Sequence, residues 1–252
     1  MKPFDLELVR RRLPGRDISF FESITSTMDE AAAASRAGCP SGTAVLAEEQ
    51  TAGQGRHGHS WHSESGAGLY VSVVLRLPLP ADSLPVITLA LGLATAESIS
   101  RLTGLEPDLR WPNDVMLGER KTAGILVQLV DSAAIAGIGI NVNHTAFPRE
   151  IASDATSLRI VSGRTQSRED LLVELLPAID SFGRMLVEGG RQPVIDQFAR
   201  HSSYARGRRV RVTQPDGFVE GVTAGLDPAG FLIVRRDDGT DSLILAGGVR
   251  PL

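Results

Sequence analysis

The fold is decided by a glycine-rich stretch that lies between two apolar segments: QTAGQGRHG, residues 50–58. The segment before it, residues 43–48, and the segment after it, residues 69–77, both have the composition of β-strands. Residues 50–68 are therefore expected to form a long loop between two strands. Loops of this length inside compact domains usually carry function, so this loop is the first candidate for a site.

The same stretch places Gly53, Gly55 and Gly58 at the spacing of a dinucleotide-binding fingerprint. That fingerprint must open a helix whose N-terminus receives a pyrophosphate, whereas here turn residues lead back into a strand near residue 69. The context therefore excludes a dinucleotide site. What remains is a backbone rich in N–H groups, with Arg56 inside it, that can wrap an anionic ligand. A solvated loop without a ligand is the alternative.

Outward from the loop, the hydrophobic period changes repeatedly between that of strands and that of helices, which predicts mixed α and β structure rather than a repeat or a helical bundle. Further strands are expected at residues 18–24, 109–117, 123–130 and 134–142, and helices after Ser26 and at residues 85–102, 167–189 and 193–201. Pro177 should kink the third of these helices. From residue 207 onward, short strands separated by turn residues predict a small barrel. We expect two domains, residues 1–203 and 204–252.

Composition and charge exclude several classes of protein. The chain has 252 residues and a net charge of −4, which gives no global reason to bind DNA or an anionic membrane. The single cysteine, Cys39, cannot form an internal disulfide, and the N-terminus is charged rather than apolar, so a cytoplasmic location is expected. The longest apolar stretch, residues 85–96, is too short to cross a bilayer as a helix.

A second polar cluster consists of WPND, residues 111–114, and KTAG, residues 121–124. A hairpin over residues 115–120 would place Asp114 and Lys121 on adjacent strands. A lysine on a buried strand is costly unless it faces a partner or a ligand. From the residues alone, a salt bridge between Asp114 and Lys121 and a catalytic role for Lys121 are equally good interpretations.

A third cluster, GIGINVN at residues 137–143, is a strand with alternating glycines. Such a strand lets a flat ligand or another backbone approach closely, and Asn141 can read the edge of an adenine. Tight packing within the sheet is the alternative. The loop histidines His57, His59 and His62 have no cysteine near them and only Glu64 as a nearby acid, so we expect no fixed metal site among them.

Taken in order, these clusters closely resemble the biotin protein ligase family over residues 20–252. The matching features are Ser26-Thr27, the loop at residues 50–58 with Trp61, the WPND cluster, Lys121 with residues 123–126, and residues 139–141. The resemblance implies an α+β fold with a mixed β-sheet flanked by helices, as in the catalytic domain shared by biotin and lipoate ligases, which is similar to class II aminoacyl-tRNA synthetases. A C-terminal SH3-like β-barrel would follow this domain.

The resemblance also implies a role for individual residues. Catalysis would involve Lys121, Arg56 and Asp114, with Lys121 bridging the biotin carboxylate and the α-phosphate of ATP. Contacts with biotin are implied for Ser26, Thr27, Gln50, Gly53, Gly55, Arg56, Gly58, Lys121 and Gly124. Contacts with ATP or the adenylate are implied for Arg56, Trp61, Asn113, Lys121 and Asn141. Met28, Gln54 and His57 depart from the commonest pattern of the family, and Gln54 removes one loop cation.

The implied reaction is the ATP-dependent formation of biotinyl-5′-AMP from biotin and ATP, followed by transfer of biotin to a lysine of a biotin carboxyl carrier protein. Mg²⁺ is expected to arrive with ATP rather than on fixed protein ligands. A lipoate-type ligase is one alternative, and a biotin-responsive regulator is another. The residues before residue 18 are too few for a helix-turn-helix, so no DNA binding is expected. A homodimer is possible.

Overall fold

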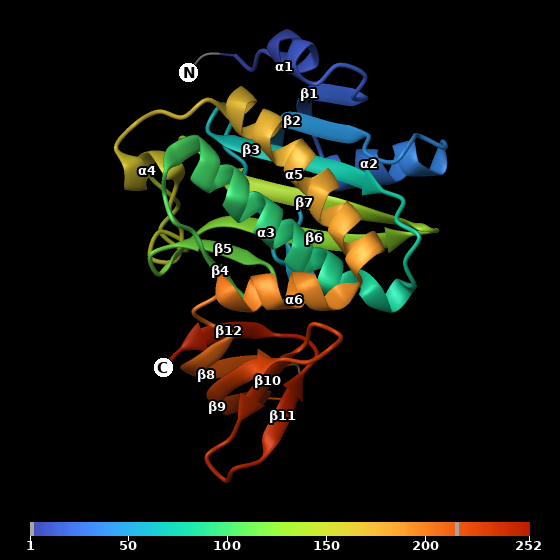
Figure 1. The fold of residues 1–252 in the computed structure, drawn as a ribbon. Helices are drawn as coiled ribbons and strands as arrows, with labels where there is room; N and C mark the ends of the chain where they lie inside the picture. Colours follow the sequence, from blue (N-terminus) through green and yellow to red (C-terminus); the bar gives the residue numbers. More distant parts are fainter. Residues whose placement is uncertain (1–2, 215–216) are drawn as a thin grey trace.

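The computed structural model describes residues 3–214 and 217–252, which fold around two β-sheets (Figure 1). The larger sheet has seven strands in the order β1-β2-β3-β7-β6-β5-β4. Only β1 and β2 run parallel, and every other neighbouring pair is antiparallel. The sheet is therefore mixed, which confirms the expectation from the family resemblance.

The strands of this sheet follow the predicted segments with one difference. Their bounds are β1 Ile18–Ile24, β2 Ala44–Gln50, β3 Gly68–Leu75, β4 Asp108–Arg110, β5 Asp114–Leu117, β6 Arg120–Val130 and β7 Ala133–Asn141. The prediction of a single strand over residues 109–117 is wrong, because residues 111–113 form a turn that divides this segment into β4 and β5. The two short strands pair with each other, so that Arg110 lies directly opposite Asp114.

Helices cover both faces of the larger sheet (Figure 1). On one face, α3 (Leu84–Thr103) and α5 (Arg168–Gly189) pack with α6 (Arg191–Arg200) over the main core. On the other, α2 (Thr27–Arg36) packs through Met28 and Ala31 on β2, β3 and β7. Two short helices, α1 (Leu6–Arg12) and α4 (Leu158–Ser162), lie at the margin.

Local sequence signals account for the ends of these helices. The Oγ of Ser26 accepts a hydrogen bond from the backbone N–H of Met28 at the start of α2, and the Oγ of Ser167 accepts one from Asp170 at the start of α5. Pro177 lies inside α5, which continues on both sides of it, and the kink expected at this residue stays a prediction. The segment Ala81–Thr103 is long and apolar enough to cross a membrane, but 72% of its most apolar window is buried inside the protein. It is a core helix.

The second sheet is antiparallel, with five strands in the order β11-β10-β9-β8-β12. The strands are β8 Arg206–Gln214, β9 Gly217–Leu226, β10 Leu232–Arg235, β11 Asp241–Ile244 and β12 Gly248–Pro251. The expected closed barrel is not seen in the part of the chain that the structure describes, because no pairing joins the outer strands β11 and β12. The indole N–H of Trp111 donates a hydrogen bond to the carbonyl of Gly230 (2.9 Å), which ties the two sheets together.

Candidate active site

A cavity opens where the long loop lies over β6 and β7. It encloses about 450 Å³ of empty space, its mouth included. Its walls come from the start of α2, the end of β2, the loop, and strands β6 and β7. The lining residues are Thr27, Met28, Gln50, Gln54, Gly55, Arg56, Trp61, Asn113, Lys121, Gly124, Ile125, Leu126, Gly137, Ile138 and Gly139. The three sequence clusters therefore meet in one place.

One end of the cavity is polar and neutral. The side-chain oxygen of Gln50 accepts hydrogen bonds from the backbone N–H of Thr27 (2.9 Å) and from its hydroxyl (3.1 Å). The hydroxyl of Thr27 also contacts the hydroxyl of Ser72 at 2.8 Å. The backbone N–H of Gln50 donates to Ser63 Oγ (2.9 Å), which joins the two ends of the loop. This end offers both donors and acceptors to an uncharged polar ligand group.

The floor of the cavity is made of glycine. Gly124 on β6 and Gly139 on β7 are paired in register, and the ring of Trp61 lies directly on both. A Cβ on Gly139 would stand 2.4 Å from the ring, and one on Gly124 would stand 2.8 Å from it. Only glycine allows this approach, so Gly124 and Gly139 make room for a flat aromatic ring on the sheet.

The opposite end of the cavity carries charge. Lys121 Nζ lies 2.6 Å from one carboxylate oxygen of Asp114, and Arg110 Nη2 lies 2.7 Å from the other. Burial by itself raises the pKa of Asp114, but Lys121 and Arg110 outweigh it, and the net pKa lies below the usual value. The Lys121 ammonium also lies 5.3 Å from the centre of the Trp61 ring. The predicted salt bridge is present, and Lys121 lines the cavity at the same time.

Arg56 brings a third cation to this end, after Lys121 and Arg110. Its Nη1 donates a hydrogen bond to the side-chain oxygen of Asn113 (3.0 Å), and the Asn113 amide nitrogen donates to the carbonyl of Ile125 (3.0 Å). Burial lowers the pKa of Arg56, and Asp114 opposes the shift. Asn113 therefore holds the loop arginine over β6, next to Lys121.

Five of the residues expected at the site do not line the cavity. One is Asp114, whose carboxylate is paired with Lys121 and Arg110 beside the cavity. Ser26 is fully buried, and its hydroxyl caps α2. Gly53 and Gly58 lie in the loop but are not part of the lining. Asn141 is almost fully buried, and its amide nitrogen donates to the carbonyl of Thr156 (3.1 Å). Their assigned ligand contacts stay predictions.

Several residues at the site were missed by sequence reasoning. Ser72 is a hydroxyl in an otherwise apolar strand, and that contrast was an available signal. Arg110 is placed only by the turn that divides the predicted strand, and Ser63 only by the path of the loop. Met28 was noted as a departure from the family pattern, and its sulfur fills the space above Gly137, where a Cβ would stand 2.5 Å away.

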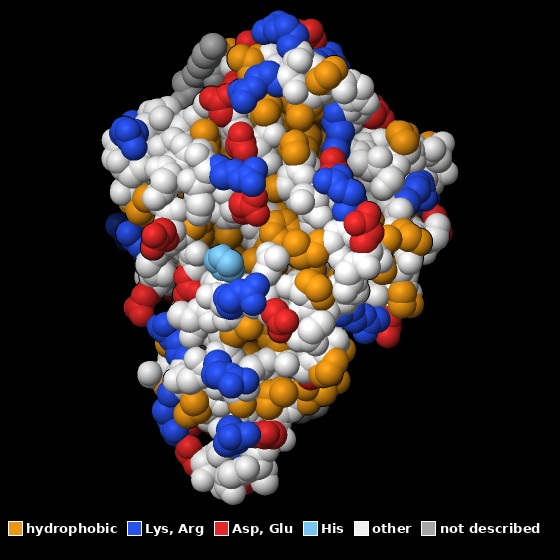
Figure 2. All heavy atoms as spheres, viewed as in Figure 1, with side chains coloured by type: hydrophobic (Ala, Val, Ile, Leu, Met, Phe, Trp, Pro, Cys, Tyr) orange, Lys and Arg blue, Asp and Glu red, His pale blue; other side chains and the backbone are white. Residues whose placement is uncertain are grey.

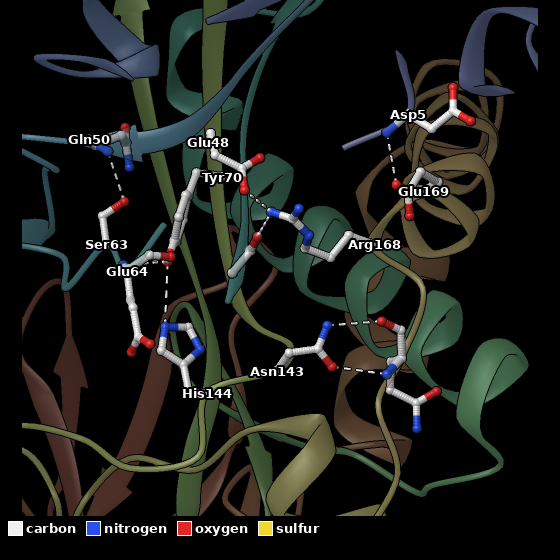
Figure 3. Close-up of polar contacts among 12 residues, drawn as sticks. Asp5, Glu48, Gln50, Ser63, Glu64, Tyr70, Asn143, His144, Arg168 and Glu169 are labelled. Carbon is white, nitrogen blue, oxygen red and sulfur yellow. Dashed lines mark hydrogen bonds and ion pairs between the residues drawn. The ribbon is translucent and has the colours of Figure 1, made fainter. Parts of the chain in front are cut away.

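A second polar cluster lies at the end of the loop, outside the cavity (Figure 3). The hydroxyl of Tyr70 accepts from the backbone N–H of Glu64 (2.8 Å) and lies 3.4 Å from Nε2 of His144. Burial raises the pKa of Tyr70 to about 12. Burial, and next the proximity of His62, lowers the pKa of His144 to about 4. Beside this cluster, Arg168 forms a buried ion pair with Glu48 at 3.0 Å.

Comparison with known proteins gives a consistent relationship. Residues 20–144 match the Biotin/lipoate A/B protein ligase family, and residues 206–249 match the Biotin protein ligase C terminal domain. The chain is 31% identical over 247 residues to the bifunctional ligase/repressor BirA of Bacillus spizizenii, covering 94% of this chain and 75% of that protein. It is 33% identical over 212 residues to the biotin--[acetyl-CoA-carboxylase] ligase of Mycobacterium tuberculosis, covering 82% of this chain and 77% of that one.

Solved structures give the same relationship. The biotin protein ligase from Aquifex aeolicus in complex with biotin and ATP is similar with a TM-score of 0.84 and 30% identity, covering 94% of this chain and 99% of that one. The Leishmania major enzyme in complex with biotinyl-5-AMP is similar with a TM-score of 0.63 and 26% identity, covering 91% of this chain and 99% of that one. On the sequence relationship, the fold and the cavity together, the chain belongs to the biotin protein ligase family.

Proposed function

We propose that this protein is an ATP-dependent biotin protein ligase that acts in the cytoplasm. The observation that carries the proposal is a single cavity with a neutral polar end at Gln50 and Thr27, a glycine floor, and a cationic end at Lys121 and Arg56. Biotin combines a neutral ureido ring, an apolar chain and a carboxylate. The cavity offers matching chemistry in the same order.

The first step joins two anions. An oxygen of the biotin carboxylate attacks the α-phosphorus of ATP, the bond to the β-phosphate oxygen breaks, and biotinyl-5′-AMP and pyrophosphate form. Bringing the carboxylate and the phosphates together is unfavourable without cations, and Lys121 and Arg56 supply that charge. We assign to Asp114 the positioning of Lys121 through the 2.6 Å ion pair.

In the second step, the amine of an acceptor lysine attacks the acyl carbon, the bond to the phosphate oxygen breaks, and AMP leaves. The adenylate must be protected from water until the acceptor arrives. Closure of residues 50–68 over the cavity provides this protection. We propose that Trp61 then leaves the glycine floor and packs against the adenylate, because its ring lies where a bound ligand would have to lie.

Mg²⁺ enters the proposal as part of the ATP substrate. Mg²⁺ sites in proteins usually include one or two carboxylates, and none of the described residues that line the cavity is acidic. The carboxylate of Asp114 is already paired with two cations. We therefore propose that the phosphates of ATP, rather than side chains of the cavity, supply most of the ligands of Mg²⁺.

The acceptor that we propose is a biotin carboxyl carrier protein or domain of a carboxylase. A role as ligase rather than DNA-binding repressor agrees with the net charge of −4 and with the mixed basic and acidic side chains on the face that Figure 2 shows. Sequence-specific retardation of a DNA fragment that persists as the salt concentration rises would contradict that part of the proposal. A homodimer stays a prediction, which sedimentation would test.

The transfer reaction tests the proposed function. The chain is incubated with ATP, Mg²⁺, biotin and an apo carrier domain, and the carrier is analysed by mass spectrometry. We expect one biotinyl group per carrier domain, and no modification of a carrier variant whose acceptor lysine is arginine. Lipoate in place of biotin is the matched control, and modification of the carrier by lipoate alone would favour the lipoate-type alternative.

A further inference from the structure

Three metal-binding side chains converge outside the cavity, at the end of the long loop. The ligand atoms of His62, Glu64 and His144 all lie within 4.8 Å of one another. His62 and Glu64 lie in the last part of the loop, before β3. His144 follows β7, the strand that pairs with β3. The catalytic proposal uses none of the three. From the sequence we expected no metal site among the loop histidines, but folding brings one of them, His62, to the distant His144. His57 and His59 do not belong to this group.

We propose that His62, Glu64 and His144 form a binding site for a divalent transition metal of the zinc class. Two imidazoles and one carboxylate are a ligand set that suits Zn²⁺, with a fourth position left for water. Ligands of a tetrahedral zinc lie about 2.0–2.2 Å from the metal. The three ligand atoms must therefore draw closer by no more than roughly 1–2 Å, which the loop residues can provide.

The site has one rigid wall. His144 is fully buried, and its ring stacks on Phe147 with centroids 5.1 Å apart. Its backbone carbonyl accepts a hydrogen bond from Ser157 Oγ (2.7 Å). The neighbouring Asn143 exchanges two hydrogen bonds of 2.9 Å with the backbone of Gln166 (Figure 3). These contacts hold His144, one of the three metal ligands, in position.

Tyr70 positions the backbone of the loop ligand Glu64. Its hydroxyl donates to the carbonyl of Glu64 (3.1 Å) and accepts from the backbone N–H of the same residue. The Tyr70 ring is itself fixed, because it fills the space above Gly68, where a Cβ would stand 2.2 Å from the ring. In Figure 3 the Nε2 edge of the His144 ring faces Tyr70 and the side of the cluster on which the Glu64 carboxylate lies.

Metal binding at this point has a consequence for the active site. Ser63 lies between the two loop ligands, and its hydroxyl accepts the backbone N–H of Gln50, whose side chain binds Thr27. A metal that joins His62 and Glu64 to His144 fixes Ser63 between them. A bound metal would therefore restrain the end of the loop next to the polar end of the cavity. Its role would be to regulate loop movement and not to take part in the reaction.

Titration of the full-length, metal-free protein with Co²⁺ in the absence of ATP tests the proposal. We expect a visible absorption spectrum of four- or five-coordinate cobalt, with one ion per chain, that is displaced by Zn²⁺. The variants His62→Ala and Glu64→Gln should each weaken binding by at least about tenfold, since even changes to outer-shell partners cost a metal site that much. His59→Ala, a loop histidine outside the group, is the matched control.

Two results would overturn the proposal. One is a cobalt spectrum that stays that of the hydrated ion. The other is binding that is equally tight in wild type, His62→Ala and Glu64→Gln, or that is lost in His59→Ala instead. His62 is partly exposed and Glu64 is exposed, so both variants are expected to fold. Circular dichroism verifies this before the titration. None of these measurements depends on biotin, so the outcome is independent of the proposed ligase activity.

Discussion

Lys121→Ala separates the two roles that Lys121 combines in this structure. Its ammonium pairs with Asp114 at 2.6 Å and also lines the cavity. If the lysine serves only the ion pair, its loss should cost stability. If it stabilises the charge that develops between the biotin carboxylate and the α-phosphate, its loss should cost catalysis.

The structure predicts unequal magnitudes for these two effects. The Lys121 side chain is 29% exposed, and Asp114 keeps Arg110 at 2.7 Å when the lysine is removed. A partly exposed ion pair contributes roughly 0–1 kcal/mol, so the free energy of unfolding should fall by about 1 kcal/mol at most. The pKa of Asp114 should rise towards its usual value, because one of its two cations is gone. Removing one preorganised transition-state contact instead slows a reaction by about 10²–10³-fold.

Two assays on the same preparation measure both effects. Biotin-dependent ATP–pyrophosphate exchange reports formation of the adenylate, and urea unfolding reports stability. Biotin binding by calorimetry should change little, because the neutral end of the cavity is intact. Arg120→Ala, an exposed neighbour at the start of β6, is the control and should behave as wild type. Exchange within threefold of wild type, with stability lowered by more than about 1 kcal/mol, would refute a catalytic role.

Three further predictions follow from the same geometry. Trypsin should cut after Arg56 in the free protein, and biotin with ATP and Mg²⁺ should slow this cut far more than cuts elsewhere. Arg76 should stay protected by its hydrogen bonds to the carbonyls of Ser35 and Cys39. Equal cleavage rates after Arg56 with and without ligands would show that the loop is not a lid. Gly139→Ala should weaken biotin binding at least tenfold, about 1.4 kcal/mol, because the new Cβ fills part of the glycine floor on which the ligand would lie. The α5 control Gly183→Ala, whose Cβ would stand 3.6 Å from Leu77, should bind biotin as wild type does. Unchanged calorimetric affinity in Gly139→Ala contradicts this prediction. Arg168→Met should lower the free energy of unfolding in urea by about 3–5 kcal/mol, because the Glu48 carboxylate is left buried without its cation. A loss under about 1 kcal/mol would show that Glu48 finds another partner.

Most elements of the larger domain were predictable, because each has its own hydrophobic periodicity and is bounded by turn or capping residues. The strand at residues 18–24 and the serine caps of α2 and α5 are local features, and local features can be read from sequence. The turn inside residues 109–117 was missed, because Trp111 lies between two short apolar segments and is itself buried. The pairing of the C-terminal strands was not predictable either, since it depends on which edges meet.

The candidate site was predictable as three clusters, but their shared geometry was not. Gly124 and Gly139 lie opposite each other only because β6 and β7 pair in that register. Arg110 reaches Asp114 across a turn that the sequence concealed, and Asn141 turns its amide towards Thr156 rather than the cavity. The group of His62, Glu64 and His144 joins residues about eighty positions apart, so no local pattern announces it.

The most direct test of the ligase assignment is ATP–pyrophosphate exchange by the wild-type protein with a single added acid. The neutral polar end at Gln50 and Thr27 should recognise the ureido ring of biotin, which lipoate lacks. Exchange should therefore require biotin and should stay at the background rate with lipoate at the same concentration. Exchange that is driven by lipoate and not by biotin would contradict the account.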